Sequence, residues 1–335
     1  MYTIKKAYIS ASGLSIGYKK KATSLYKNLS FELYKGELVC LLGANGAGKS
    51  TLLRTISRSQ SATDGTIFIG DKDINVYTEK ELSHILGLVL TDKISAGGFT
   101  VRELVELGRY PYTGFFGQLS KADKEIAQKA MEDVGISHKA DSYVAELSDG
   151  EKQKAMIAKS LTQECPIVLL DEPTAFLDVE SRMEIMNLLR SLAVEQNKVI
   201  LLSTHDIDIA LLLADKLWLL SRKSGLKCGV TEDLVTSGEL DYFFGTDKIY
   251  FNKETGQFLP NQKKNKRVII ESEKYLYHWT QNLLAKFGFY EVQDRTGKTL
   301  VVNSKSPTDI SACLGENIYK FSSFGELAGW LHSYE

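Results

Sequence analysis

Residues 43–50, Gly-Ala-Asn-Gly-Ala-Gly-Lys-Ser, have the residue types and the spacing of a phosphate-binding loop. They match the pattern G-x-x-x-x-G-K-[ST] in full, between an apolar strand-like run and a predicted helix. Backbone N–H groups of such a loop, with the positive end of the helix dipole, bind phosphate oxygens. The Lys49 ammonium can reach the β- and γ-phosphates, and the Ser50 hydroxyl suits Mg²⁺. The predicted nucleotide-binding residues are Gly43, Asn45, Gly46, Ala47, Gly48, Lys49, Ser50 and Thr51.

Two adjacent carboxylates, Asp171 and Glu172, end a second apolar run. Ligands of open α/β sheets bind at the carboxyl ends of the strands, so we expect this pair to face the phosphate-binding loop. Asp171 is placed to hold Mg²⁺, directly or through water, and Glu172 to orient or deprotonate the attacking water. A solvated acidic loop is the alternative for the pair alone. The complete phosphate-binding loop favours a site of phosphoryl transfer.

The elements that must position these residues follow the order of an α/β core. Helical patterns occur at residues 50–57 and 120–134, and Thr100 and Glu103 have the spacing of a capping box. Apolar strands that alternate with helices predict a largely parallel sheet. The strand-like runs are residues 37–42, 66–69, 86–90, 166–170 and 199–203.

The pattern changes after about residue 245. Residues 250–258 predict a hairpin around Gly256. The polar, basic run at 261–267 predicts a linker because nothing in it can be buried, with an RNA-binding patch as the alternative. Residues 268–335 predict a small α+β accessory domain of unknown role.

Two local features are predicted within this accessory domain. Tyr275, Trp279 and neighbouring apolar residues up to position 287 fall on one helical face, which we expect to be core. Ser323 and Glu326 have the spacing of another capping box, before a further helix.

The chain also resembles the ATPase subunits of ABC transporters, over roughly residues 5–260. Residues 147–151, Leu-Ser-Asp-Gly-Glu, correspond to the family's Leu-Ser-Gly-Gly-Gln signature, residues 175–178 to its D-loop, and residues 203–206 to the segment with its switch histidine. The resemblance implies a P-loop NTPase domain at residues 1–260, with a mixed sheet core and a helical subdomain at about 92–160. It also implies ATP and Mg²⁺ as cofactors.

The resemblance assigns roles to further residues. It implies that Ser148, Gly150 and Glu151 contact the γ-phosphate held by a second copy, so that ATP joins a head-to-tail homodimer. Asp178 would then lie at the dimer seam, and His205 would sense the γ-phosphate beside the catalytic glutamate. Tyr18 matches the aromatic residue that stacks on adenine.

Two departures from the family pattern affect the site. Where the family usually has a glutamine that contacts Mg²⁺, this chain has Thr91 at or near that position, whose hydroxyl has a shorter reach. In the signature, Asp149 and Glu151 replace glycine and glutamine and bring two carboxylates near a triphosphate. We expect them to weaken ATP-driven dimerisation unless Lys152 or Lys154 offsets their charge.

Bulk properties limit where the protein acts. The 335 residues carry a net charge of -1, so no overall positive field attracts nucleic acid. The four cysteines form no CxxC pair, which predicts reduced thiols. The N-terminus shows no apolar segment of a signal peptide, and no apolar run approaches the length of a membrane span. We therefore predict a peripheral protein at the cytoplasmic face of the cell (inner) membrane, docked to a separate integral permease.

Residues 100–112, ending in Gly-Arg-Tyr-Pro-Tyr, resemble the importer branch for iron–siderophore complexes, haem and cobalamin. That resemblance implies an extracytoplasmic substrate-binding protein as an indirect partner. It also places residues 100–112 against the permease, where Phe99, Tyr110 and Tyr112 are either packing anchors or ordinary aromatic residues. An importer of another metal or small solute is the first alternative. An ABC ATPase that acts on ribosomes or DNA is the second.

Overall fold

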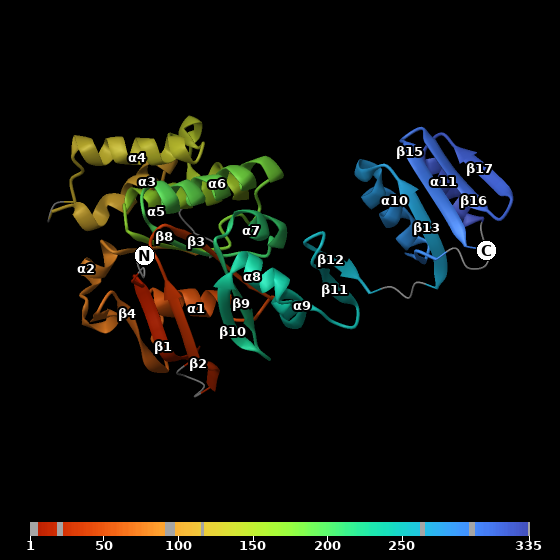
Figure 1. Cartoon of the computed structure of the whole chain (residues 1–335). Coiled ribbons are helices and arrows are strands. Elements are labelled where there is room, and N and C mark those ends of the chain that lie inside the picture. The colour runs from red at the N-terminus through yellow and green to blue at the C-terminus, as the bar shows by residue number, and fades with distance from the viewer. Residues whose placement is uncertain are drawn as a thin grey trace, which may run out of the picture. The chain divides into compact units, whose positions relative to one another are not determined.

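The computed structural model describes residues 6–18, 23–90, 98–114, 117–261, 265–294 and 299–333 (Figure 1). The chain divides into two compact units. The first comprises Met1–Thr246 with Tyr250–Leu259, and the second comprises Asp247–Ile249 with Pro260–Glu335. Each unit has its own hydrophobic core.

A six-stranded sheet forms the centre of the first unit, in the order β10-β9-β3-β8-β7-β6. The five strands from β9 to β6 are parallel, and β10 is an antiparallel edge. Successive residues alternate between two cores: Val39 and Leu41 face one, and Leu38 and Cys40 face the other. Burial on both faces explains the continuous apolar runs in the sequence and confirms a largely parallel sheet. The strands are β3 (Glu37–Gly43), β6 (Leu86–Val89), β7 (Ile167–Asp171), β8 (Val199–Ser203), β9 (Lys216–Ser221) and β10 (Gly225–Val230).

A four-stranded antiparallel sheet, in the order β2-β1-β4-β5, contributes to the core on one side of the central sheet (Figure 1). Helix α1 (Lys49–Ile56) packs into the same core through Leu52, Leu53 and Ile56. This packing fixes the start of α1, and therefore the phosphate-binding loop before it. The strands are β1 (Ile9–Tyr18), β2 (Thr23–Leu33), β4 (Asp64–Ile69) and β5 (Lys72–Asp73).

Helices cover the other face of the central sheet (Figure 1). The predicted capping box of Thr100 and Glu103 is confirmed, and Ser148 and Glu151 form another. Because each box satisfies N–H groups that a helix start leaves unpaired, these positions define where the helices begin. Besides α1, the described α-helices of this unit are α2 (Glu79–Ser83), α3 (Val101–Glu106), α4 (Lys121–Asp133), α5 (Asp149–Thr162), α6 (Val179–Glu195), α7 (Ile207–Leu213), α8 (Thr231–Thr236) and α9 (Glu239–Phe244), and a 3-10 segment at Leu107–Tyr112 follows α3.

The described residues of the second unit form a five-stranded mixed sheet, in the order β14-β13-β15-β16-β17, and two helices. The hairpin β11 (Ile249–Asn252) and β12 (Gln257–Pro260) precedes it, as the sequence predicts. Strand β13 begins at Lys266, inside the run predicted to be a linker. The elements are β13 (Lys266–Ser272), α10 (Lys274–Lys286), β14 (Phe289–Glu291), β15 (Leu300–Ser306), β16 (Asp309–Leu314), β17 (Asn317–Phe321) and α11 (Phe324–His332).

Two local predictions for this unit are wrong. Tyr275 and Trp279 are 62% and 63% exposed, because α10 turns Leu276, Thr280 and Leu284 toward the sheet instead. Positions 275 and 279 lie one residue, about 100° of helix, away from that buried stripe.

The second error concerns the start of α11. Ser323 caps the helix, since its hydroxyl accepts the N–H of Glu326 at 3.2 Å. The Glu326 carboxylate, however, accepts hydrogen bonds from the N–H and hydroxyl of Ser322 at 2.7 and 2.8 Å. The reciprocal half of a capping box is therefore displaced by one residue.

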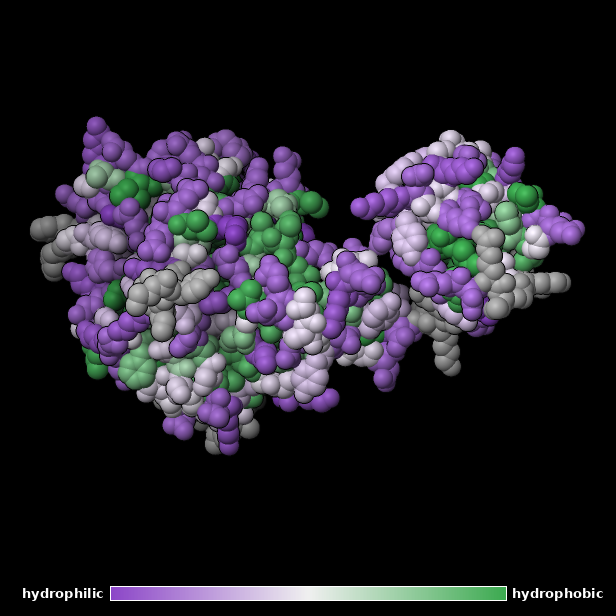
Figure 2. All heavy atoms as spheres, viewed as in Figure 1, coloured by the Kyte–Doolittle hydropathy of each residue, from purple (hydrophilic) through white to green (hydrophobic). Residues whose placement is uncertain are grey.

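Most of the visible surface is hydrophilic, with hydrophobic side chains gathered over α7 (Figure 2). Leu212 on this short helix is 68% exposed. Within the described ranges, no helix is both long enough and apolar enough to cross a membrane.

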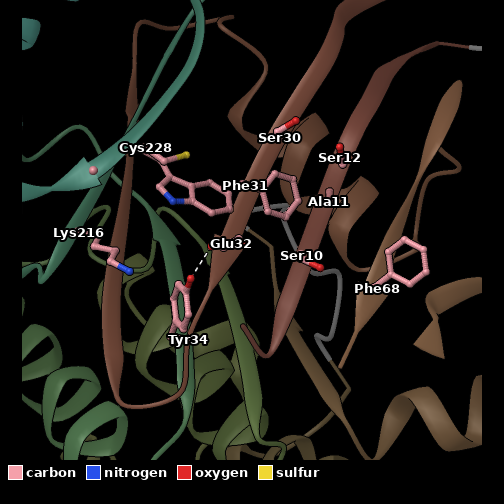
Figure 3. Close-up of a pocket in the computed structure, with 12 residues that line it drawn as sticks. Ser10, Ala11, Ser12, Ser30, Phe31, Glu32, Tyr34, Phe68, Lys216 and Cys228 are labelled. Atoms are coloured by element: carbon pink, nitrogen blue, oxygen red, sulfur yellow. Dashed lines mark hydrogen bonds between the residues drawn. The ribbon is translucent and has the colours of Figure 1, made fainter. Parts of the chain in front are cut away.

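A cavity lies where the antiparallel sheet meets strands β9 and β10 (Figure 3). The Lys216 ammonium sits 4.2 Å from the centre of the Tyr34 ring, and the Tyr34 hydroxyl donates to Glu32. That hydrogen bond is the largest of several causes that raise the pKa of Tyr34 to about 12. The cavity shares no lining residue with the nucleotide motifs.

Candidate nucleotide-binding and hydrolysis site

The phosphate-binding loop runs from the end of β3 to the start of α1, where the sequence predicts it. Gly46 and Gly48 adopt φ angles of 73° and 102°, which glycine tolerates best. A Cβ on Gly48 would lie 2.5 Å from Leu25 Cδ2, and one on Gly43 would lie 2.7 Å from the carbonyl oxygen of Leu220. Glycine is therefore required at both positions. The N-cap residue of α1 is Gly48, which has no side chain to cap the first N–H groups of the helix, so these groups can donate to phosphate.

Lys49 lies at the centre of the site and is only 6% exposed. Its ammonium donates to the Gly43 carbonyl oxygen at 2.9 Å and lies 3.0 Å from His205 Nε2 and 3.8 Å from Glu172 Oε1. Burial lowers the pKa of Lys49, and the charges of Glu172 and Asp171 oppose this shift. The structure thus holds a buried cation against the loop, in the position from which it can bind phosphate.

Asp171 and Glu172 lie at the carboxyl end of β7, beside the end of β8. Asp171 is 2% exposed, and its Oδ1 accepts the hydroxyl hydrogen of Ser203 at 2.6 Å. The Glu172 N–H donates to the Ser203 hydroxyl at 3.0 Å and its carbonyl at 3.1 Å. These bonds hold Glu172 in a left-handed conformation with φ of 50°, which is uncommon for a non-glycine residue.

His205 completes this group, with Nε2 only 2.7 Å from Glu172 Oε1. Both side chains line a groove of about 320 Å³ that Thr174, Phe176 and Arg182 also line. The structure therefore brings Lys49, Glu172 and His205 together, although they are distant in the sequence.

The donor set fits Mg²⁺. Ser50 is exposed at the start of α1 and supplies a hydroxyl, and Asp171 supplies a carboxylate, so both offer oxygen ligands of the kind Mg²⁺ prefers. The third predicted ligand, Thr91, lies outside the described residues.

Tyr18, the predicted adenine contact, ends β1 beside the helix that follows the loop. Its hydroxyl lies 3.4 Å from the Thr51 hydroxyl, and the residue is 54% exposed. An exposed ring next to the loop is available for stacking on a base.

The signature residues form a separate surface around the start of α5. The Ser148 hydroxyl accepts the Glu151 N–H at 3.3 Å, and the Glu151 carboxylate accepts the Ser148 N–H at 2.8 Å. A Cβ on Gly150 would lie 3.3 Å from both Leu177 Cδ2 and the Phe176 carbonyl oxygen. Next to them, Asp178 caps α6 by accepting the Ser181 N–H at 2.7 Å. The signature and the D-loop therefore share one surface.

The signature carboxylates are partly neutralised. Lys139 lies 3.4 Å from Glu151, and Lys152 lies 3.8 Å from Asp149. Lys154, the other lysine expected to offset the charge, is 3.6 Å from Glu184 instead. The pKa of Glu151 is lowered, chiefly by the hydrogen bond from the Ser148 N–H.

Two residues of the site are not predicted by the sequence. Ser203 links Asp171 to Glu172, but a serine at a strand end carries no chemical signal until neighbouring strands are known. Arg222, in the turn after β9, donates to the Gly46 carbonyl oxygen at 3.0 Å. Its approach to the loop depends on the pairing of β9 with β3, which sequence spacing does not reveal.

Comparisons with known proteins agree with this geometry. The sequence profile of the family described as ABC transporter matches residues 26–175. The ferric enterobactin transport ATP-binding protein FepC of Escherichia coli (strain K12) is 36% identical over 239 residues, which cover 71% of this chain and 88% of that protein.

Solved structures show the same fold. A chain of an inward-facing ABC transporter assigned to the metal-chelate type aligns with a TM-score of 0.64 and 28% identity, over 77% of this chain and 99% of that one. A bacterial ABC transporter cassette solved as a dimer aligns with a TM-score of 0.60 and 27% identity, over 67% and 98%. The chain described here therefore belongs to the ATP-binding subunits of ABC transporters and is an ABC-type ATPase.

Proposed function

We propose that this ATPase energises uptake of an iron–siderophore complex through a separate membrane permease, at the cytoplasmic face of the membrane. The observation that carries the substrate class is the similarity to a ferric enterobactin transport protein over 88% of its length. The metal-chelate assignment of a structural neighbour points the same way. An extracytoplasmic binding protein would deliver the complex to the permease.

Each residue of the site has a separate role in ATP hydrolysis. The loop N–H groups and Lys49 bind the β- and γ-phosphates, and Tyr18 stacks on the adenine. Glu172 orients the attacking water and accepts its proton, while His205, 2.7 Å from that carboxylate, holds it in place and contacts the γ-phosphate. Mg²⁺, held by Ser50 and Asp171, would neutralise charge on the β- and γ-phosphates.

Two copies form the active arrangement. Ser148 is exposed at the start of α5, beside the D-loop, so one surface would present both motifs to a second copy. In a head-to-tail pair, Ser148 and Gly150 of one copy would complete the phosphate site around Lys49 of the other. The dimeric cassette among the structural neighbours supports this pairing.

The permease would contact a groove beside the 3-10 segment Leu107–Tyr112. The groove encloses about 540 Å³ and is lined by residues that include Leu82, Leu107, Tyr110 and Pro111. Tyr110 is 71% exposed, whereas the Tyr112 hydroxyl donates to the Gln163 carbonyl oxygen at 2.7 Å. Tyr110 is therefore the free anchor for a permease helix, and Tyr112 supports the wall of the groove.

Uptake assays test this function. A strain lacking the chain should lose uptake of a labelled ferric siderophore, and the parent gene should restore it. Complementation with Tyr110→Ala should restore less uptake although the purified variant still binds ATP. Unchanged siderophore uptake in the deletion strain, with loss of haem or cobalamin uptake instead, would reject the siderophore assignment and retain the importer.

A further inference from the structure

The sheet of the second unit has one covered face and one open face among the described residues. Both helices pack on the same side, because Leu284 of α10 and Leu327 of α11 belong to one core with Val268, Val302 and Ala312. Side chains alternate along a strand, so their neighbours point to the opposite face.

That opposite face carries an apolar row across four strands. Strand register places Ile269 beside Val301, Val301 beside Cys313, and Cys313 beside Ile318. None of the four belongs to the core of the unit, and Ile318 is 64% exposed. With strands about 4.8 Å apart, the row is about 14 Å long.

Charges flank the row in a self-complementary pattern. On β13, Arg267 and Glu271 lie two residues before and after Ile269 on the same face. Strand β17 runs in the same direction as β13, and Lys320 follows Ile318 by two residues on it. Glu316 lies two residues before Ile318, in the turn that leads into β17, so the negative charge comes first here, whereas the positive charge comes first around Ile269. The order of positive and negative charge around Ile269 is therefore the reverse of the order around Ile318.

A second copy of this face fits that pattern. A twofold axis along the row would place each row residue opposite itself. The same rotation exchanges the two sides of the row, so Arg267 would face Glu271 of the second copy, and Lys320 would face Glu316. An isologous interface requires this kind of self-complementarity.

We propose that the open face of the C-terminal sheet packs against the same face of a second copy, with the row Ile269, Val301, Cys313 and Ile318 at its centre. Sheets packed face to face lie about 10 Å apart. The patch is small for a dimer held together by this contact alone. Other contacts between the two copies would raise their effective concentration and so strengthen this one. It does not depend on the ATP-bound pairing, because it involves no residue of the nucleotide site.

Cross-linking of the full-length chain tests this proposal. The Cys313 thiol would face its counterpart, so a bismaleimide with a reach of about 10 Å should give a covalent dimer in the absence of nucleotide. Cys313→Ser should abolish the product. The same product in a Lys49→Ala background would separate this contact from the nucleotide-dependent pairing of the proposed function.

A charge swap provides the specific test. Lys320→Glu should slow cross-linking about fivefold or more, because it places two carboxylates opposite each other. Adding Glu316→Lys to that variant should restore the rate to within about twofold of the parent. A Cys313 cross-link to a permease subunit instead of a second copy, or a double variant as slow as the single one, would overturn the proposal, as would absence of the dimer in the parent.

Discussion

Ser203→Ala removes the hydroxyl that joins the two carboxylate positions of the hydrolysis site. In the parent, this hydroxyl donates to Asp171 Oδ1 at 2.6 Å and accepts the Glu172 N–H at 3.0 Å, in a position with no solvent exposure. The Glu172 N–H keeps its bond to the Ser203 carbonyl, but Asp171 loses a donor. A hydrogen bond to a charged group contributes about 1.5–3 kcal/mol.

If most of this energy serves to hold Asp171 and Glu172 in place, kcat should fall about 10- to 100-fold, because about 1.4 kcal/mol corresponds to a factor of ten. ATP affinity should change less than about threefold, because Lys49, which binds the phosphates, is held by Gly43 and His205 and not by Ser203. The assay is ATP hydrolysis by the complex with the permease, with nucleotide binding measured separately. Ser203→Thr, which retains the hydroxyl, should recover much of the rate.

Ser160→Ala is a matched control for this experiment. Ser160 is also buried, at 5% exposure, and its hydroxyl has no hydrogen-bond partner in the part of the chain that the structure describes. Its removal should leave kcat close to that of the parent. A Ser203→Ala variant that hydrolyses ATP at the parent's rate would refute the positioning role, as would an equal loss in both variants.

Three further changes test other parts of the account. Asp149→Gly removes a carboxylate near the expected triphosphate. It should tighten ATP binding by the assembled complex about fivefold at low salt and less at high salt. Weaker ATP binding by this variant would contradict the charge argument. The Arg109 side chain is 7% exposed and forms ion pairs with Asp123 and Glu164. Arg109→Met breaks these ion pairs and should lower the free energy of unfolding, measured in urea, by about 3 kcal/mol. A loss below about 1 kcal/mol would contradict this. Glu151→Gln should lower the free energy of unfolding by about 1 kcal/mol at pH 7 and by progressively less as the pH falls below 4.5. A carboxylate with a lowered pKa stabilises the fold fully above its ordinary value of 4.5 and loses that stabilisation as the pH falls through the folded-state pKa; a cost that does not change with pH would contradict this origin.

Motif spacing predicts the phosphate-binding loop and the carboxylates well, because each depends on a short local sequence. The loop needs glycines at fixed positions before a helix, and Gly48 with its φ of 102° shows why. The capping box of Ser148 and Glu151 also depends on a short local sequence, but it emerges only from the structure, because the resemblance treats these two only as signature residues. Glutamate at position 151, where the family has glutamine, still caps the start of α5.

Tertiary packing decides what the sequence does not reveal. A helical face that contains both Trp279 and Leu284 is apolar over more than one stripe, so periodicity alone does not select the stripe that meets the sheet. Ser203 and Arg222 enter the site only because β8 pairs with β7, and β9 with β3. The contacts between Lys49, His205 and Glu172 likewise depend on the order of the strands.

The central claim is that Lys49 binds the phosphates and Glu172 activates water in one site. The most direct measurement is ATP binding and hydrolysis by the Lys49→Ala and Glu172→Gln variants, each assembled with the permease. Lys49→Ala should lose tight ATP binding, whereas Glu172→Gln should bind ATP like the parent and hydrolyse it at least about 100-fold more slowly. Turnover near the parent's rate in the Glu172→Gln variant would contradict the account.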